Sequence, residues 1–204
     1  MKNIIFDFGK VIGYFSEKDI VSKFSSKPEI QKFLINNVIL SPEWMKFGII
    51  DSGYISELEA INMINDRTNN AYKDIVYNFM INYHKYMYIQ EELIDIIKRL
   101  KSQGYKLYML SNTNEIMYQK FIKNIENLFD GVVLSYKIHK IKPYDSIYKY
   151  LIDEFNLNPE ESLFIDDVED NINTAKKFGI QGRKVIPNNI EDIKNVLREY
   201  KIGD

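Results

Sequence analysis

The sequence contains no cysteine, which excludes disulfide bonds, zinc sites with Cys ligands and a thiolate nucleophile. Long apolar runs are also missing. The first run, residues 4–6, ends at Asp7, whereas a membrane helix needs about 18 apolar residues or more. Lys and Arg together number 27 against 29 Asp and Glu, so there is no basic surplus. We therefore expect a cytoplasmic protein without a nucleic-acid or membrane partner, whose oligomeric state the sequence leaves open.

What is present is enough apolar material for a core: 45% of the 204 residues are hydrophobic. This length fits one domain, or one domain that carries an insertion. Several short apolar segments are nearly continuous, which is typical of parallel strands covered on both faces. The predicted strands are residues 3–6, 106–110, 131–134, 162–165 and 183–186.

Helical patterns lie between these strands from about residue 90 onward. Leu93, Ile96, Ile97 and Leu100 are spaced to lie on one helix face, and the pattern ends at Gly104, a plausible residue just beyond the helix. Similar patterns occupy residues 148–155, 172–179 and 190–197. Strands that alternate with helices predict an α/β fold, a doubly wound, Rossmann-like, mostly parallel sheet of five strands.

The segment from residue 16 to 86 differs because nothing in it reads as a strand. One of its helical patterns opens with Ser56 and Glu59 as a capping box, followed by Leu58, Ile61 and Ile64 on one face. This block is long for a simple crossover between two strands. We therefore predict a catalytic core of residues 1–15 and 87–204 and an inserted helical cap of residues 16–86.

Polar residues follow the predicted strands where ligands bind in open α/β sheets, at the carboxyl edge. Asp7 follows the first strand, Ser111 the second, Lys142 lies in the loop after the third, and Asp166 with Asp167 follow the fourth. Each has an ordinary alternative as a turn, cap or surface residue. Together, acidic oxygens suit Mg²⁺, whereas a hydroxyl, backbone N–H groups and an ammonium suit a phosphoryl group.

The order of these residues resembles the four signature motifs of the haloacid dehalogenase-like (HAD) superfamily. The strings Phe-Asp-Phe-Gly at 6–9, Leu-Ser-Asn-Thr-Asn at 110–114 and Phe-Ile-Asp-Asp at 164–167 are similar to those of bacterial glucose-1-phosphatase-like members. Those members belong to the subfamily with a small helical cap. Ser135 and Asn171 also match its pattern. A response-regulator receiver domain carries a comparable set, but its acidic pair comes with the first strand, so we reject that reading.

The resemblance implies a role for each motif residue. Asp7 would be the nucleophile that becomes an aspartyl-phosphate. Mg²⁺ would be bound by Asp7, the backbone carbonyl of Gly9 and Asp167, with Asp166 taking part directly or through water.

Phosphate binding would fall to the remaining motif residues. Ser111, Asn112 and Lys142 would bind the phosphoryl oxygens, with Ser111 and Lys142 counted as catalytic. Lys137 and Lys140 compete for the lysine role, but the Lys-Pro pairing at 142–143 favours Lys142.

One position departs from most phosphatases of the superfamily. They carry a second Asp two residues after the nucleophile as general acid and base, and here that position is Gly9. Glucose-1-phosphatase-like members share the glycine. The proton would then come from the substrate, from water, or from a carboxylate near the cap such as Glu17 or Asp19, although both also suit a first helical turn.

Three further features leave alternatives open. Lys10 either faces solvent or adds positive charge near the phosphate. His139 stands where relatives often have glycine, so the backbone of that loop is expected to differ. Trp44 and the aromatic residues at 83–88 are expected to pack the cap, and alternatively to line a pocket roof.

The function predicted first is a Mg²⁺-dependent phosphatase for small phosphorylated metabolites, such as sugar phosphates including glucose 1-phosphate. The alternatives are a 2-haloacid dehalogenase, a catalytically weak regulatory or binding protein, and a phosphomutase. A dehalogenase needs an early cap Arg for the substrate carboxylate, and the first Arg after Asp7 is Arg67. A phosphomutase would need an acid–base residue at the position of Gly9.

Overall fold

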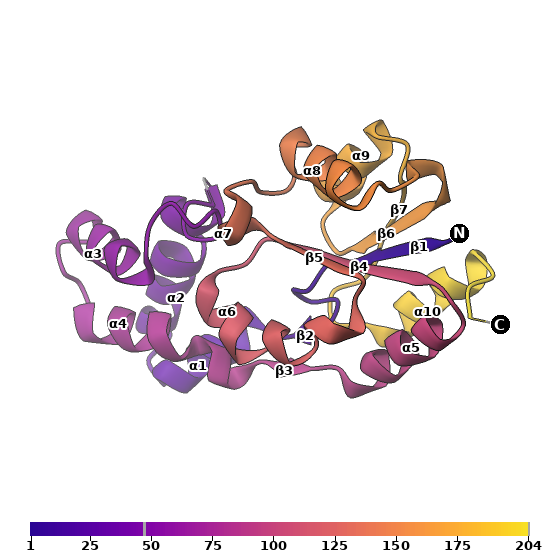
Figure 1. Ribbon diagram of the computed structural model, residues 1–204. Coiled ribbons are helices and arrows are strands. Elements are labelled where there is room, and N and C mark those ends of the chain that lie inside the picture. The colour runs from indigo at the N-terminus through magenta and orange to yellow at the C-terminus, as the bar shows by residue number, and fades with distance from the viewer. Residues whose placement is uncertain (47, 204) are drawn as a thin grey trace.

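The computed structural model describes residues 1–46 and 48–203. Its centre is a parallel sheet with the strand order β5-β4-β1-β6-β7, in agreement with the predicted fold class (Figure 1). The strands are β1 (Asn3–Phe6), β4 (Lys106–Ser111), β5 (Gly131–Leu134), β6 (Ser162–Asp166) and β7 (Gln181–Lys184).

The central strand β1 is buried on both faces, which explains its continuous apolar sequence. Ile4 and Phe6 belong to one hydrophobic cluster, with Leu93 and Ile193 from the helices α5 (Glu91–Ser102) and α10 (Ile190–Glu199). Ile5 points to the opposite face and packs with residues of α8 (Asp145–Phe155) and α9 (Glu169–Lys177). Adjacent side chains of a strand alternate between faces, so one tripeptide anchors both helical layers.

The covering helices begin and end close to the positions predicted for them. Gly104 and Gly179, at the ends of α5 and α9, have the positive φ angles of 90° and 84° that favour glycine. In this part of the chain the helices are α5 (Glu91–Ser102), α6 (Glu115–Lys120), α7 (Ser135–Ile138), α8 (Asp145–Phe155), α9 (Glu169–Lys177) and α10 (Ile190–Glu199). Single 3₁₀ turns η4, η5 and η6 lie at Ile122–Asn124, Glu126–Leu128 and Pro159–Glu161.

The last strand differs from the prediction of residues 183–186. β7 begins at Gln181 and ends at Lys184, opposite Asp166, because β6 offers no partner beyond that residue. Ile186 is exposed and its N–H donates to the Asp192 side chain instead. The missed residues Gln181 and Gly182 carry no large apolar side chain, so no apolar pattern in the sequence marks the start of this strand.

Helices fill the segment between β1 and α5, beyond the carboxyl ends of the strands (Figure 1). The capping box of Ser56 and Glu59 is confirmed. Leu58 was placed wrongly: at 3.6 residues per turn it lies off the buried face of Ala60, Ile61 and Ile64, and it is exposed. The elements are α1 (Glu17–Phe24), α2 (Pro28–Leu34), the π-helical turns η1 (Ile35–Ile39) and η2 (Pro42–Lys46), α3 (Glu57–Arg67), α4 (Lys73–Asn82) and η3 (Tyr83–Tyr86).

A second, two-stranded sheet was not predicted. β2 (Gly13–Tyr14) pairs antiparallel with β3 (Tyr88–Ile89), so the two chain passages that flank the helical segment are hydrogen-bonded to each other. Strands of two residues are too short to show an alternating pattern.

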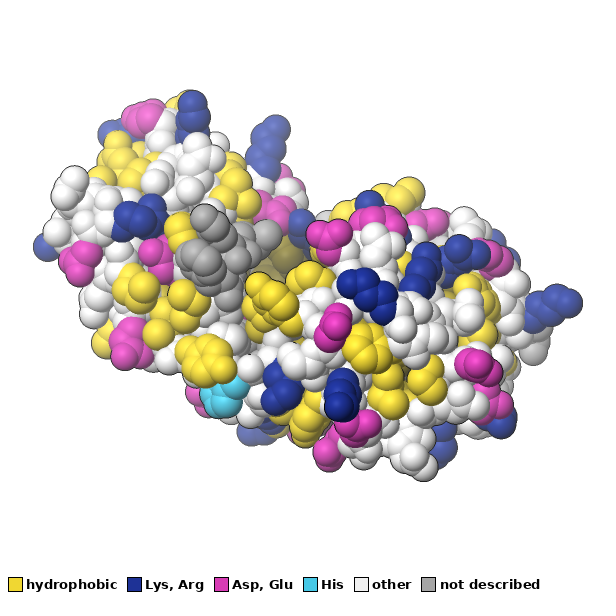
Figure 2. Space-filling model, turned by 90° about the horizontal axis from the view of Figure 1, so that it is seen from above, with side chains coloured by type: hydrophobic (Ala, Val, Ile, Leu, Met, Phe, Trp, Pro, Cys, Tyr) yellow, Lys and Arg dark blue, Asp and Glu magenta, His cyan; other side chains and the backbone are white. Residues whose placement is uncertain are grey.

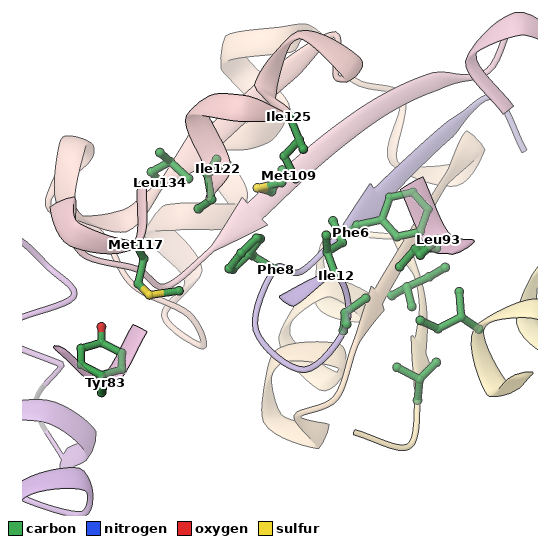
Figure 3. Packing of buried hydrophobic residues seen from close by; sticks show 14 of the residues in the cluster. Phe6, Phe8, Ile12, Tyr83, Leu93, Met109, Met117, Ile122, Ile125 and Leu134 are labelled. Carbon is green, nitrogen blue, oxygen red and sulfur yellow. The ribbon is translucent and has the colours of Figure 1, made fainter. Parts of the chain in front are cut away.

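The larger hydrophobic cluster is continuous from the sheet into the helical segment. Phe8, Met109 and Met117 from the sheet side belong to it together with Tyr83 (Figure 3). On the face seen in Figure 2, acidic and basic side chains are interspersed and neither sign forms a continuous patch. Within the described residues no helix is both long and apolar enough to cross a membrane.

Candidate active site

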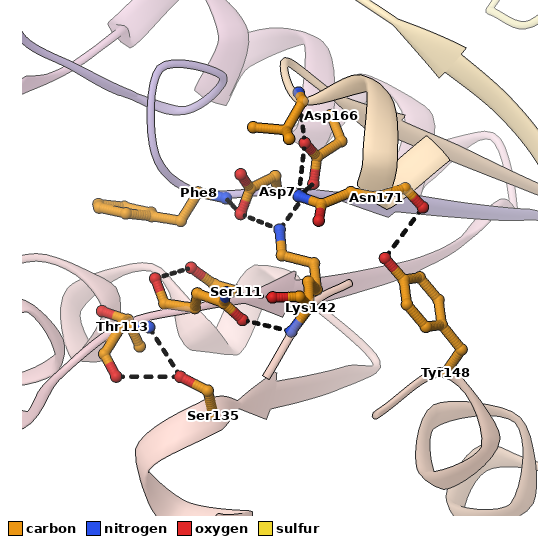
Figure 4. A network of polar contacts seen from close by, with 11 residues as sticks. Asp7, Phe8, Ser111, Thr113, Ser135, Lys142, Tyr148, Asp166 and Asn171 are labelled. Carbon is orange, nitrogen blue, oxygen red and sulfur yellow. Dashed lines mark hydrogen bonds and ion pairs between the residues drawn. The ribbon is translucent and has the colours of Figure 1, made fainter. Parts of the chain in front are cut away.

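Three neighbouring strands bring the motif residues to one edge of the sheet. β1 lies between β4 and β6, so Asp7 lies beside the last residues of those strands, Ser111 and Asp166 (Figure 4). β4 and β6 each run one residue further than predicted, and these two residues therefore end their strands rather than follow them. Their positions are consequently fixed by the sheet itself.

Lys142 reaches this edge from the loop after α7. Its Nζ lies 2.8 Å from Asp7 Oδ1 and 2.7 Å from Asp166 Oδ2, and its side chain is buried. Burial alone would lower the pKa of Lys142, but the charges of Asp166 and Asp7 outweigh it and raise the pKa. Lys142 is therefore a charged ammonium held between two carboxylates.

Asp7 is a buried carboxylate at the end of β1. Its Oδ1 also accepts a hydrogen bond of 2.7 Å from the N–H of Phe8. Burial raises the pKa of Asp7, Lys142 opposes the shift, and the neighbouring charge of Asp166 adds to it. The site thus concentrates negative charge beyond what one lysine neutralises.

Asp166 is fully buried and engaged through both oxygens. Oδ1 accepts from the N–H of Val168 at 2.8 Å and from Asn171 Nδ2 at 3.0 Å, while Oδ2 accepts from Lys142 and, at 2.9 Å, from the same Asn171 nitrogen. Asp167 is only half-buried, and burial followed by the charge of Asp166 raises its pKa. Asp167 is therefore the freer of the two carboxylates.

Asp7, Asp166 and Asp167 form a cluster whose possible ligand atoms all lie within 4.8 Å of one another. Hard divalent cations prefer such oxygen ligands. The donor set and its excess of negative charge over Lys142 therefore fit a magnesium ion.

Ser111 is the last residue of β4, and Asn112 follows it. The Ser111 hydroxyl donates to the carbonyl of Asn112 at 3.3 Å. The Asn112 side chain binds the backbone of Lys142: Nδ2 donates to its carbonyl at 2.9 Å, and Oδ1 accepts from its N–H at 2.8 Å. The side chain of Asn112 thus fixes the lysine loop.

Ser135, the first residue of α7, connects the site to the helical segment. Its hydroxyl oxygen accepts from the N–H of Thr113 at 2.8 Å, lies 3.1 Å from the Thr113 carbonyl and also contacts the carbonyl of Asp51. One hydroxyl thereby joins the loop after β4 to the loop before α3.

The competing lysines lie elsewhere. Lys137 packs its ammonium 3.7 Å from the centre of the Tyr118 ring, and Lys140 donates to the carbonyl of Ile138 at 3.4 Å. His139 has a φ of 55°, so its backbone adopts the left-handed conformation that glycine favours despite the side chain.

The residues considered as replacements for the missing acid also differ from one another. Lys10 forms an ion pair of 2.6 Å with Glu17, which lines a pocket next to the site. Asp19 is exposed, and its N–H donates to the hydroxyl of Ser16, the residue that caps α1.

That pocket has a volume of about 210 Å³ and lies between the sheet edge and the helical segment. The sheet side contributes Gly9 and residues 112–114, and the helical segment contributes Trp44, Asp51 and Tyr83. The rings of Trp44 and Tyr83 meet edge to face with centres 5.2 Å apart.

One expectation about this region needs correction. Tyr83 is buried, and Tyr86, although exposed in part, packs its ring edge to face on Phe24 of α1, as expected of residues that pack the cap. Tyr88 is exposed and its ring lies against Tyr14 of β2, so the prediction is wrong for Tyr88. Sequence reasoning also missed Asp51, because a lone Asp before a glycine turn is indistinguishable from an ordinary loop residue.

Comparisons with known proteins identify the family of the chain. Residues 46–185 match the model of the haloacid dehalogenase-like hydrolase family, and the chain belongs to that family. It is 26% identical to D-ribitol-5-phosphate phosphatase from Bacteroides thetaiotaomicron, over 89% of this chain and 90% of that protein. It is 27% identical to (S)-2-haloacid dehalogenase 4A from Burkholderia cepacia, over 60% of this chain and 48% of that protein.

A similar fold occurs in a HAD family enzyme from Bacteroides thetaiotaomicron whose crystal structure is a complex with magnesium and inorganic phosphate. The TM-score is 0.71 at 22% identity, covering 93% of this chain and 96% of the other. This likeness concerns the fold.

Proposed function

We propose that the protein is a Mg²⁺-dependent phosphomonoester hydrolase that acts on small phosphorylated metabolites through an aspartyl-phosphate at Asp7. The observation that carries the proposal is the contact of Lys142 with both Asp7 and Asp166 beside the acidic cluster. The phosphatase from Bacteroides thetaiotaomicron, which the chain resembles over most of its length, supports it.

The metal site would consist of the Asp7 carboxylate, the Asp167 carboxylate and the backbone carbonyl of Gly9. Bound there, Mg²⁺ offsets the repulsion between Asp7 and a phosphate dianion. Asp166 would contribute through water, because its own oxygens already accept four hydrogen bonds.

The chain's own groups would perform the transfer. Lys142 favours the ionised form of Asp7 against the effect of burial, and a carboxylate oxygen of Asp7 attacks phosphorus while the bond to the leaving oxygen breaks. Lys142, the Ser111 hydroxyl and the N–H of Asn112 would stabilise the charge on the phosphoryl oxygens. Water then attacks the phosphorus of the aspartyl-phosphate, which releases inorganic phosphate and restores the Asp7 carboxylate.

We further propose that residues 1–15 and 87–204 form the catalytic core and that residues 16–86 form a cap that selects the substrate. The pocket between them would take the leaving group. Sugar and polyol phosphates are the first candidates: glucose 1-phosphate follows from the motif resemblance, and D-ribitol 5-phosphate from the relative.

A 2-haloacid dehalogenase is the second candidate, because the chain also resembles such an enzyme over part of its length. Two observations argue against it. Arg67 donates to Glu43 from two nitrogens at 3.2 Å and to the carbonyl of Asn37, and is thereby engaged away from the acidic cluster. The acidic cluster itself suits a metal, which carbon–halogen hydrolysis of this type does not need.

Phosphate release from a panel of sugar, polyol and triose phosphates, with Mg²⁺ and with a chelator, tests the proposal. We expect metal-dependent release that Asp7→Asn abolishes and that the control Asp170→Asn, an exposed carboxyl on the neighbouring helix α9, leaves unchanged. Halide release from 2-haloacids without metal, or no release from any substrate, would contradict it.

A further inference from the structure

We propose that Asp51 is the general acid of the reaction, a catalytic residue that protonates the leaving oxygen in place of the side chain absent at Gly9. This inference rests on the proposed function. Alkoxide leaving groups depart slowly without a proton, and general acid catalysis typically contributes about 10²–10⁴-fold. A phosphatase of this geometry therefore needs a proton donor beside the leaving group.

Asp51 is fixed against the sheet edge although it belongs to the helical segment. Its backbone carbonyl contacts the Ser135 hydroxyl, and His139 Nδ1 lies 2.8 Å from the carbonyl of the next residue, Ser52. Gly53 has a φ of 71°, and a Cβ there would collide with the backbone of Tyr136. Three consecutive residues thus contact α7 or the residue that follows it, so these contacts fix the position of Asp51.

Asp51 and Gly9, the position without an acidic side chain, lie at the same pocket. Both residues line it, together with Asn112 and Asn114. A Cβ at Gly9 would meet only Phe15 Cε1, at 3.8 Å, so a side chain could begin at that position without a clash. A leaving group in this pocket would lie between the sheet edge and Asp51.

Asp51 can hold a proton near neutral pH. Burial of the carboxyl group raises the pKa of Asp51 to about 7, against hydrogen bonds from Trp44 and Asn114 and with a further rise from the charge of Glu57. The other nearby ionisable group is Tyr83, whose pKa is raised by burial.

Glu17, the other carboxyl group lining the pocket, is in a different electrostatic environment. Its carboxylate is already engaged by the ammonium of Lys10 in an ion pair of 2.6 Å. Asp19 lies outside the residues that line the pocket. Asp51 is therefore the better donor of the three.

The step balances in protons and bonds. As the Asp7 oxygen bonds to phosphorus and the bond between phosphorus and the leaving oxygen breaks, the carboxylic acid of Asp51 gives its proton to that oxygen. The alcohol leaves, and Asp51 remains as a carboxylate. Asp51 then takes a proton from the water that attacks the aspartyl-phosphate, and the enzyme is restored.

The test compares Asp51→Asn on two substrates that differ in their need for a proton. For the best alkyl phosphate of the panel we expect kcat to fall by about 10²–10⁴-fold. For 4-nitrophenyl phosphate, whose leaving group departs without protonation, we expect a change of less than about threefold. The decline of kcat for the alkyl phosphate as pH rises past the Asp51 pKa should also disappear.

A second variant supplies the missing acid elsewhere. Gly9→Asp in the Asp51→Asn background should restore most of the alkyl phosphatase activity, because the space beside Gly9 is open. Asp19→Asn, a matched carboxyl-to-amide change in α1, should change neither substrate.

Three outcomes would overturn the inference. They are an equal loss on both substrates, no loss on either, and a selective loss in Glu17→Gln instead. The activity of the unmodified enzyme is measured first. If it releases phosphate from neither substrate, the proposed function itself fails, independently of the role of Asp51.

Discussion

Asn112 holds Lys142 by both polar atoms of its backbone, with side-chain hydrogen bonds of 2.9 Å to the carbonyl and 2.8 Å from the N–H. The ammonium that contacts Asp7 therefore depends on an amide side chain from another strand end. Replacing Asn112 by Ala should leave Lys142 present but displaced. Because misplacement by about 1 Å can reduce the rate roughly 10²-fold, we expect a loss of that order in kcat.

Steady-state kinetics with a thermal unfolding curve would check the Asn112→Ala prediction. Asn173→Ala, an exposed amide on α9, serves as the control. A variant with full kcat would mean that the lysine loop keeps its place without this pair of hydrogen bonds.

Lys142→Met should destabilise the fold and make its Tm depend more strongly on Mg²⁺. The change leaves Asp7 and Asp166 buried without their shared cation, and breaking such a pair costs about 3–5 kcal/mol. We expect the Tm to fall and to recover on adding Mg²⁺ by more than the unmodified protein gains, since the carboxylates then rely on the metal alone.

Calorimetry with and without Mg²⁺ would measure both shifts in Tm. Lys140→Met changes a lysine of the same loop whose ammonium donates to the carbonyl of Ile138 and lies over the Tyr150 ring, away from the carboxylates, and it should behave like the unmodified protein. A Lys142→Met protein with an unaltered Tm and no response to Mg²⁺ would refute the electrostatic account of the site.

The ion pair between Arg67 and Glu43 should make the stability of the helical segment depend on pH. Burial opposes ionisation of Glu43, but the hydrogen bonds from Arg67 outweigh it and hold the pKa of Glu43 below its ordinary value. A lowered folded-state pKa stabilises the fold above the unfolded-state pKa, and this contribution is lost as pH falls through the folded-state pKa.

Arg67→Ala should therefore lower the free energy of unfolding by roughly 1–3 kcal/mol at neutral pH, less if solvent at the partly exposed Arg67 screens the pair. The gap to the unmodified protein should shrink in acid, where Glu43 becomes neutral. Urea unfolding at neutral and at acidic pH measures this difference in the free energy of unfolding. Arg198→Ala, at an exposed arginine, is the control. A gap that stays constant with pH would show that lost packing, rather than charge, explains the change.

Gly53→Ala should disturb the active site as well as stability. An added methyl group meets both the unfavourable positive φ and the backbone of Tyr136. Gly104→Ala is the matched control, because its φ is also positive but no atom lies within 4 Å of the new Cβ.

We expect Gly104→Ala to cost about 1 kcal/mol and leave kcat unchanged. Gly53→Ala should cost more and lower kcat, because it pushes the segment that carries Asp51 away from α7. Equal effects of the two variants on kcat would contradict the close docking of this segment.

The elements with long, regular apolar patterns were predictable from the sequence, and those set by tertiary contacts were not. Residues 3–6 read as a strand because both faces of β1 are buried. The strand at 181–184 is exposed and polar in part, and its ends depend on where β6 stops, which no local pattern contains. Leu58 shows the same limit, since a three-residue spacing alone does not say which face of α3 is buried.

The motif residues at the strand ends were predictable because sheet topology alone brings Asp7, Ser111 and Asp166 together. Their roles in metal and phosphate binding stay predictions. Asp51 was not predictable because its position depends on a contact between segments 84 residues apart in the chain. Its unusual pKa likewise arises from burial that only the folded chain creates.

The small antiparallel pairing of Gly13 with Ile89 and of Tyr14 with Tyr88 has a mechanical consequence. The chain enters and leaves the helical segment through a double-stranded ribbon, so its two connections cannot slide past each other without breaking that pairing. Any swing of the helices relative to the sheet would therefore have to deform this ribbon, at residues 13–14 and 88–89, as one unit.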